Sequence, residues 1–160
     1  MPRILARGIE AAVKRAVLAG LLVSLAACRP SGDPVRASLD AIASAARARD
    51  ADKLMENVAA DFQAEDGSRR ADAESTLKTY FAAYESLDVT LSDVTIERSE
   101  SGPALARFTA RLSGQPRKIG GLAGLVPSAS TWKFEARLVP DGRRWKIAWA
   151  SWSPVSGPQG

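Results

Sequence analysis

The chain has 160 residues, with 22 lysines and arginines, 18 aspartates and glutamates, no histidine and one cysteine. Residues 1–27 contain four of the basic residues and one acidic residue, so residues 28–160 carry 18 basic and 17 acidic side chains. This near neutrality argues against the concentrated basic surface that nucleic-acid binding requires. A single cysteine excludes an intramolecular disulfide and a cysteine-based metal cluster.

The N-terminal segment has the features of a secretory signal. Residues 16–27 are twelve uncharged residues that follow a basic start, and they are too few to span a bilayer as a helix. They end in Leu25-Ala26-Ala27-Cys28, which resembles a bacterial lipobox, in which a diacylglycerol alkylates the cysteine thiol and the cysteine becomes the mature N-terminus. The resemblance predicts a lipoprotein signal peptide over residues 1–27, lipidation of Cys28 and a lipidated tether over residues 28–33.

The same motif implies a location and a partner. An acylated Cys28 would insert into membrane lipid and hold the protein at the bacterial cell envelope. In enteric bacteria, an aspartate after the lipidated cysteine retains the protein in the inner membrane, whereas this chain has Arg29. We therefore expect an anchor in the outer membrane, with the domain facing the periplasm.

Three helices are predicted after the tether. The first begins at Asp33-Pro34, an N-cap followed by proline at the first helical position, and extends to about Arg49. Asp50 can cap a second, shorter helix, and a third is expected from about Asp72 to near Leu87. Apolar residues recur at helical spacing in these segments: Val35, Leu39, Ile42 and Ala46; Leu54 and Val58; and Leu77, Phe81 and Tyr84.

From Asp88 onward the apolar period changes from 3.6 to 2, which predicts strands. The alternation changes phase between Leu91 and Val94, and this indicates a β-bulge near Ser92-Asp93. Three further strands follow, the last two joined by a turn over residues 140–142. Their expected apolar faces are Ala106, Phe108, Ala110 and Leu112; Trp132, Phe134, Ala136 and Leu138; and Trp145, Ile147 and Trp149.

Helices followed by hairpin-joined strands predict an α+β fold, with three N-terminal helices packed on an antiparallel sheet of four or more strands. The order of these segments resembles the nuclear transport factor 2-like superfamily, also called cystatin-like or polyketide-cyclase-like. The resemblance covers residues 34–152 and leaves residues 153–160 as a flexible tail. It is carried by the Val35/Leu39/Ile42 helix, the segment Leu54…Phe62 with Asp66-Gly67, the bulged strand over residues 89–96, and the final hairpin with Trp132, Asp141-Gly142 and Ile147.

What the superfamily implies is a strongly curved, cone-shaped sheet that often forms a pocket, but no single function, because its members include isomerases, dehydratases, epoxide hydrolases and binding domains. Its enzymes place Asp, Tyr, His or Arg inside the cone. Here the inward faces are apolar and histidine is absent. Tyr84 with Asp61 or Asp93 is the candidate catalytic set, although each residue also has a structural interpretation.

The aromatic residues of the strands and of the third helix predict a pocket. Large rigid side chains can line a cavity for an apolar ligand, or they can simply fill the core. The candidate ligand-binding residues are Phe81, Tyr84, Phe108, Trp132 and Trp149.

Residues 113–130 form an unusually long connection between two predicted strands. Its glycines alternate with apolar residues, of which Ile119, Leu122 and Leu125 are candidate contact residues. A flap over the pocket, a docking patch and a packed loop are all compatible with this pattern.

The outward face of the sheet is expected to be basic and polar. It could meet anionic headgroups or an acidic partner, or it could be a solvated surface. Its polarity argues against a sheet-on-sheet dimer and favours a monomer.

These patterns predict an envelope lipoprotein whose non-catalytic domain binds a small apolar ligand or an envelope protein. The alternative is an enzyme of the isomerase or dehydratase type that uses a Tyr/Asp pair in the cone. Neither interpretation requires a cofactor or a metal ion, and none is predicted.

Overall fold

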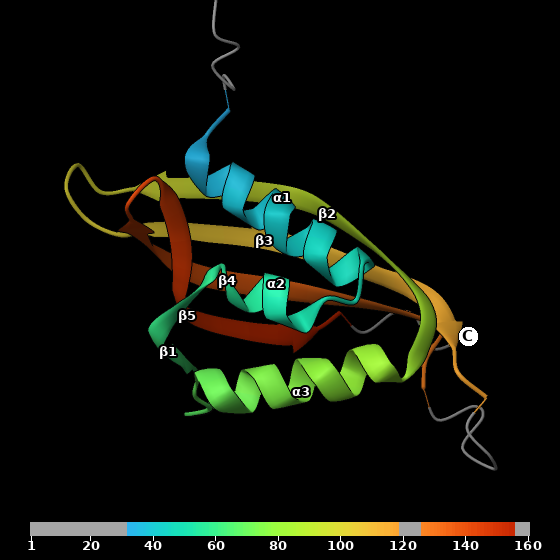
Figure 1. The fold of residues 1–160 in the computed structure, drawn as a ribbon. Coiled ribbons are helices and arrows are strands. Elements are labelled where there is room, and N and C mark those ends of the chain that lie inside the picture. Colours follow the sequence, from blue (N-terminus) through green and yellow to red (C-terminus); the bar gives the residue numbers. More distant parts are fainter. Residues whose placement is uncertain (1–31, 119–125, 156–160) are drawn as a thin grey trace, which may run out of the picture. The chain divides into compact units, whose positions relative to one another are not determined.

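Three helices and five strands make up the part of the chain that the computed structural model describes, residues 32–118 and 126–155 (Figure 1). Their order is α1 (Pro34–Arg47), α2 (Ala51–Met55), β1 (Val58–Ala64), α3 (Arg70–Ala82), β2 (Tyr84–Arg98), β3 (Ala104–Pro116), β4 (Ala129–Asp141) and β5 (Arg144–Pro154). The five strands form one sheet in the order β1-β5-β4-β3-β2. The prediction of an α+β fold with three helices is confirmed. None of the helices among these residues is long and apolar enough to cross a membrane.

The sheet is mixed, whereas the sequence predicted a wholly antiparallel one. Strands β2 to β5 are joined as antiparallel neighbours, but β1 lies parallel to β5 at the edge of the sheet. β1 was missed because the apolar residues Val58 and Phe62 also fit a helical spacing, and because the strand has two exposed residues in succession. Consequently α3 follows a strand and does not directly follow α2.

Side-chain caps fix where the helices begin. Asp33 accepts a hydrogen bond from the backbone nitrogen of Val35 (2.8 Å), and Asp50 accepts one from that of Lys53 (2.9 Å). Both caps were expected from the sequence. The third helix ends at Ala82 and not near Leu87, because Tyr84 and Leu87 belong to β2. Both of these side chains are buried in spite of the change from helix to strand.

The pairing of the strands shifts register at four places, and two of these bulges bear on the predicted faces of the strands. The bulge predicted near Ser92-Asp93 is confirmed: the pairing of β2 with β3 shifts between Ser92 and Thr95, and Asp93 has a φ of +53°. A bulge in the pairing of β4 with β5 was not predicted. In β5 the pairing shifts so that Trp149 lies opposite Arg137 while Ile147 lies opposite Leu138.

The bulge in β5 places Trp149 on the outer face, which corrects the predicted apolar face of the last strand. The guanidinium of Arg137, an exposed residue, lies over the Trp149 ring at 5.4 Å from its centroid. After the bulge, Ala150 and Trp152 take the inward positions, with Ala150 opposite the buried Ala136.

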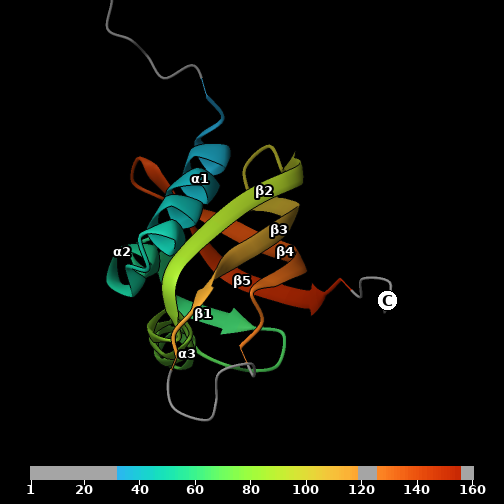
Figure 2. The ribbon, with the colours of Figure 1, turned by 90° about the vertical axis from the view of Figure 1, so that its right-hand side faces the viewer.

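The core joins the first helix to the sheet. α1 packs against β2 and β5 through its buried stripe, which includes Val35 and Leu39. Two long-range bonds attach it: the Arg47 side chain donates to the carbonyl of Val89 (2.8 Å), and the backbone nitrogen of Trp145 donates to Ser38 Oγ (3.3 Å). α3, by contrast, contacts α2, β1 and β2, and Phe81 is its one buried residue. Figure 2 shows the twisted sheet with α1 and α2 on one face.

We expect Leu138→Ala to lower the free energy of unfolding by about 2–5 kcal/mol, because Leu138 is fully buried. Trp149→Ala should cost less, about 1–2 kcal/mol, because it removes only a half-buried side chain and its contact with Arg137. Urea denaturation followed by circular dichroism measures both changes. Equal losses for the two variants would contradict the inward and outward placement of these side chains.

Candidate functional site

An apolar cavity of about 540 Å³ lies between the helices and the sheet. It exists because α3 does not pack down onto β3, β4 and β5, so that the inner faces of Ala73, Leu77 and Tyr80 stay only half-buried. Most of its lining is aliphatic or aromatic. The principal lining residues are Leu39, Ile42, Leu54 and Leu77 from the helices, and Phe108, Leu112, Trp132, Phe134, Ile147 and Trp152 from the strands.

Three aromatic rings form a continuous row across the sheet side of this cavity. Phe108, Phe134 and Trp152 lie opposite one another on β3, β4 and β5. The two phenylalanine rings stack with centroids 5.2 Å apart, and Trp152 is 6.3 Å from Phe134. Trp152 is 43% exposed, so the row extends from the cavity wall to solvent.

Tyr84 is a core residue and does not line this cavity. It is 1% exposed, and its hydroxyl donates to the carbonyl of Pro127 (2.8 Å). It therefore accepts its second hydrogen bond from the hydroxyl of Tyr80, at 3.2 Å. Burial of the phenol raises the pKa of Tyr84 above its ordinary value. The phenol consequently stays neutral at physiological pH and serves to connect α3 with the segment before β4.

The structure does not bring the candidate catalytic residues together. Asp61 on β1 and Asp93 at the β2 bulge are both exposed, and Asp93 accepts a hydrogen bond from its neighbour Ser92 (3.0 Å). Within the described residues, the hydrogen-bond partners of the Tyr84 hydroxyl are Tyr80 and Pro127. The Tyr/Asp pair of the enzyme alternative is therefore not assembled.

Two other carboxylates border the cavity, and both have structural partners. Asp66 accepts from the backbone nitrogen of Ser68 (2.9 Å), and Asp72 accepts from that of Arg69 (2.9 Å). The hydrogen bonds from Ser68 lower the pKa of Asp66, so this group remains ionised and is unsuited to act as a general acid. No group of three potential metal ligands occurs in the described parts of the chain.

Of the five predicted pocket residues, Phe81, Phe108 and Trp132 line the cavity, while Tyr84 and Trp149 do not. Trp152 and Phe134 are lining residues that were not proposed. Because of the bulge in β5, Trp152 faces the cavity and Trp149 does not. A strict alternation of apolar and polar residues does not reveal such a bulge. Cys28, Ile119, Leu122 and Leu125 lie outside the described residues.

Solved structures share this architecture. A candidate scytalone dehydratase from Novosphingobium aromaticivorans matches with a TM-score of 0.66 and 12% identity, over 77% of this chain and 83% of that one. A candidate dehydratase of the nuclear transport factor 2-like family from Streptomyces avermitilis matches with a TM-score of 0.64 and 16% identity, over 78% and 96%. The domain has the nuclear transport factor 2-like fold.

An uncharacterised protein with a cystatin-like fold from Caulobacter vibrioides agrees with this assignment, with a TM-score of 0.60, 13% identity and coverage of 78% of this chain and 89% of that one. No family model matches the sequence, and no curated protein matches it. At identities of 12–16% the likeness concerns the fold and does not extend to the residues of a site.

The titration of Tyr84 can be measured directly. Tyr80→Phe leaves Tyr84 as the one tyrosine of the chain, and its tyrosinate absorbance should appear at higher pH in the native protein than in urea, where it should titrate near pH 10. Because the folded pKa is raised, the stabilisation is fully present below about pH 10 and decreases as the pH rises further. Identical native and unfolded titrations would show that Tyr84 is accessible to water.

Proposed function

We propose that this domain binds a small apolar ligand without transforming it, within an envelope lipoprotein that is anchored through Cys28. The observation that carries the proposal is the apolar cavity of about 540 Å³, a volume within the range of about 300–1,000 Å³ that is usual for ligand sites. Half-buried aromatic rings line its sheet side. A bound apolar molecule would remove these rings from water, which is the main source of free energy for such binding.

A binding role accounts for the polar residues of the cavity better than a catalytic role. Acid–base catalysis needs a titratable group within hydrogen-bond reach of the substrate and with a pKa near the working pH. The rim carboxylates Asp66 and Asp72 accept backbone hydrogen bonds, and the Tyr84 phenol is held in the core. Two of the similar structures are described as candidate dehydratases, but the described residues of this cavity include no acid–base pair that could support such a reaction.

An open cavity also favours a small molecule over an envelope protein as the ligand. A protein partner would be bound by an extended surface, whereas the aromatic row leads inward from the exposed Trp152 to Phe134 and Phe108. The predicted lipid anchor at Cys28 would place this cavity beside a membrane, in the periplasm. Apolar molecules that move between membranes or enter the envelope are then the class of ligand that the site would meet.

Leu77→Trp should fill part of the cavity and weaken the binding of the neutral fluorophore N-phenyl-1-naphthylamine at least about tenfold, because the ring would occupy the space between α3 and the sheet. Fluorescence titration measures the Kd. Ser75→Trp is the matched control, since Ser75 is an exposed residue of α3 outside the lining. Mass spectrometry of the bound ligand before and after incubation checks that it remains unaltered.

Equal affinity in the Leu77→Trp and Ser75→Trp proteins would place the binding site outside the cavity. Chemical conversion of a ligand that the protein retains would overturn the non-catalytic role and return attention to the rim carboxylates.

Cys28→Ala should abolish metabolic labelling with a radioactive fatty acid and remove the mature, membrane-anchored form of the protein, because the thiol is the predicted site of acylation. Labelling and fractionation of the expressed full chain measure both effects. A Ser31→Ala protein, which keeps the lipobox, serves as the control. Unchanged labelling of Cys28→Ala would show that the motif is not a lipidation site.

A further inference from the structure

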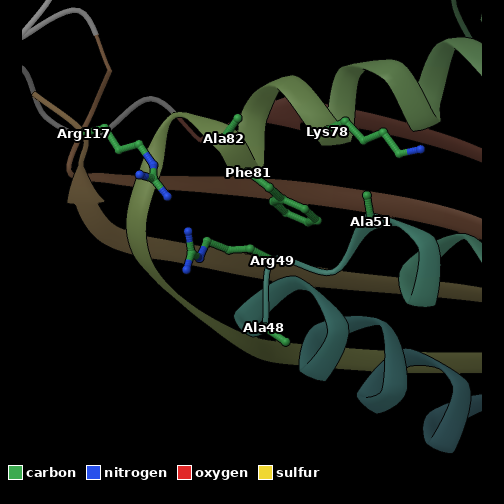
Figure 3. A pocket seen from close by; sticks show the side chains of 7 residues that line it. All are labelled: Ala48, Arg49, Ala51, Lys78, Phe81, Ala82 and Arg117. Atoms are coloured by element: carbon green, nitrogen blue, oxygen red, sulfur yellow. The ribbon is translucent and has the colours of Figure 1, made fainter. Parts of the chain in front are cut away.

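A second cavity, of about 340 Å³, shares the wall residue Phe81 with the apolar cavity and has a different chemistry. It is formed by the turn between α1 and α2, the last turns of α3 and the residue that follows β3. Three of its lining residues are basic, Arg49, Lys78 and Arg117, and none is acidic. Figure 3 shows the guanidinium groups of Arg49 and Arg117 facing each other, with Lys78 pointing away from them.

The two arginines converge on a single backbone oxygen. Arg49 Nη1 donates to the carbonyl of Tyr84 at 2.8 Å, and Arg117 Nε donates to the same oxygen at 3.2 Å. The backbone of both arginines is also fixed. The backbone nitrogen of Arg117 donates to the carbonyl of Ala83 (2.8 Å), and the backbone nitrogen of Arg49 donates to the carbonyl of Ala46 (2.9 Å). Two like charges are thus held side by side at the start of β2.

Neither guanidinium has a carboxylate within 4 Å in residues 32–118 and 126–155, although ten ion pairs occur there. Lys78 differs in this respect, because its ammonium group contacts Asp52 (3.1 Å) and Glu74 (2.6 Å). Within the described residues, the cavity's positive charge without a carboxylate partner therefore belongs to Arg49 and Arg117.

We infer that Arg49 and Arg117 form a binding site for the phosphate group of a ligand. A guanidinium carries five N–H donors in a planar fork, and the bond to Tyr84 uses one donor of each arginine. Such forks bind phosphate and carboxylate in bidentate fashion. Two converging forks suit the several acceptor oxygens of a phosphate better than the two of a carboxylate.

The phosphate could belong to a soluble ester or to a phospholipid headgroup, because both carry the same acceptor oxygens. The site is also independent of the proposed apolar ligand, because neither arginine lines the apolar cavity.

The test is a calorimetric titration of the mature protein in dodecyl maltoside micelles, which contain no phosphate, with sn-glycerol 3-phosphate in a phosphate-free buffer of low ionic strength. The Arg49→Gln/Arg117→Gln protein should bind at least about tenfold more weakly than the wild type. Arg111→Gln/Arg143→Gln is the matched control, since it removes the same charge from two exposed arginines outside this cavity. Binding of N-phenyl-1-naphthylamine should be unchanged in both proteins.

The titration is repeated in nanodiscs that contain phosphatidylglycerol. Equal affinity in micelles and nanodiscs identifies a site for soluble esters, whereas weaker binding of sn-glycerol 3-phosphate in the nanodiscs, caused by a competition that the arginine substitutions abolish, identifies a headgroup site. The absence of saturable binding in both media, or an equal loss in the control protein, overturns the inference. If circular dichroism shows that the double variant is unfolded, the titration is carried out with Arg117→Gln alone, because this variant keeps the hydrogen bond from Arg49 to the Tyr84 carbonyl.

Discussion

The fold depends on the close packing of α1 against a sheet whose central positions are occupied by small side chains. Ala104, Ala106 and Ala136 are at most 1% exposed and share one continuous core with Val35 and Leu39 of α1. Side chains of this size let a helix approach the sheet closely, and the bonds of Ser38 and Arg47 to β5 and β2 then fix its position. α3 has no comparable attachment to β3, β4 or β5. The unequal packing of the two helices is what leaves a cavity between them and the sheet.

The parts of the fold that the sequence predicted correctly are those governed by local chemistry. The caps Asp33 and Asp50 act within three residues, and the bulge at Asp93 is visible as a change of phase inside one strand. The parallel edge strand β1 depends on β5, which lies more than 80 residues later in the chain. Its segment Val58–Ala64 has no regular alternation, so only the partner strand makes it a strand.

In the candidate site, too, the residues that follow a local pattern were predicted and those that depend on distant residues were missed. Phe81, Phe108 and Trp132 were predicted because each lies on a regular apolar face, whereas Trp152 was missed because the bulge in β5 changes which residues face inward. Tyr84 was expected in the pocket, yet its hydroxyl has a partner in Pro127, 43 residues away, that no periodicity could indicate. The pair Arg49 and Arg117 is equally invisible in the sequence, since the two residues meet only through the carbonyl of Tyr84.

The turn from α3 into β2 therefore links both cavities. Phe81 forms a wall common to the two, and Tyr84 follows three residues later with its ring in the core and its carbonyl on the basic side. A displacement of this turn would alter the width of the apolar cavity through Phe81 and the spacing of the two arginines through the Tyr84 oxygen. The hydroxyl bonds of Tyr84 to Tyr80 and Pro127 oppose such a displacement. One short segment thus contributes to the walls of both cavities, through the Phe81 ring on the apolar side and the Tyr84 carbonyl on the basic side.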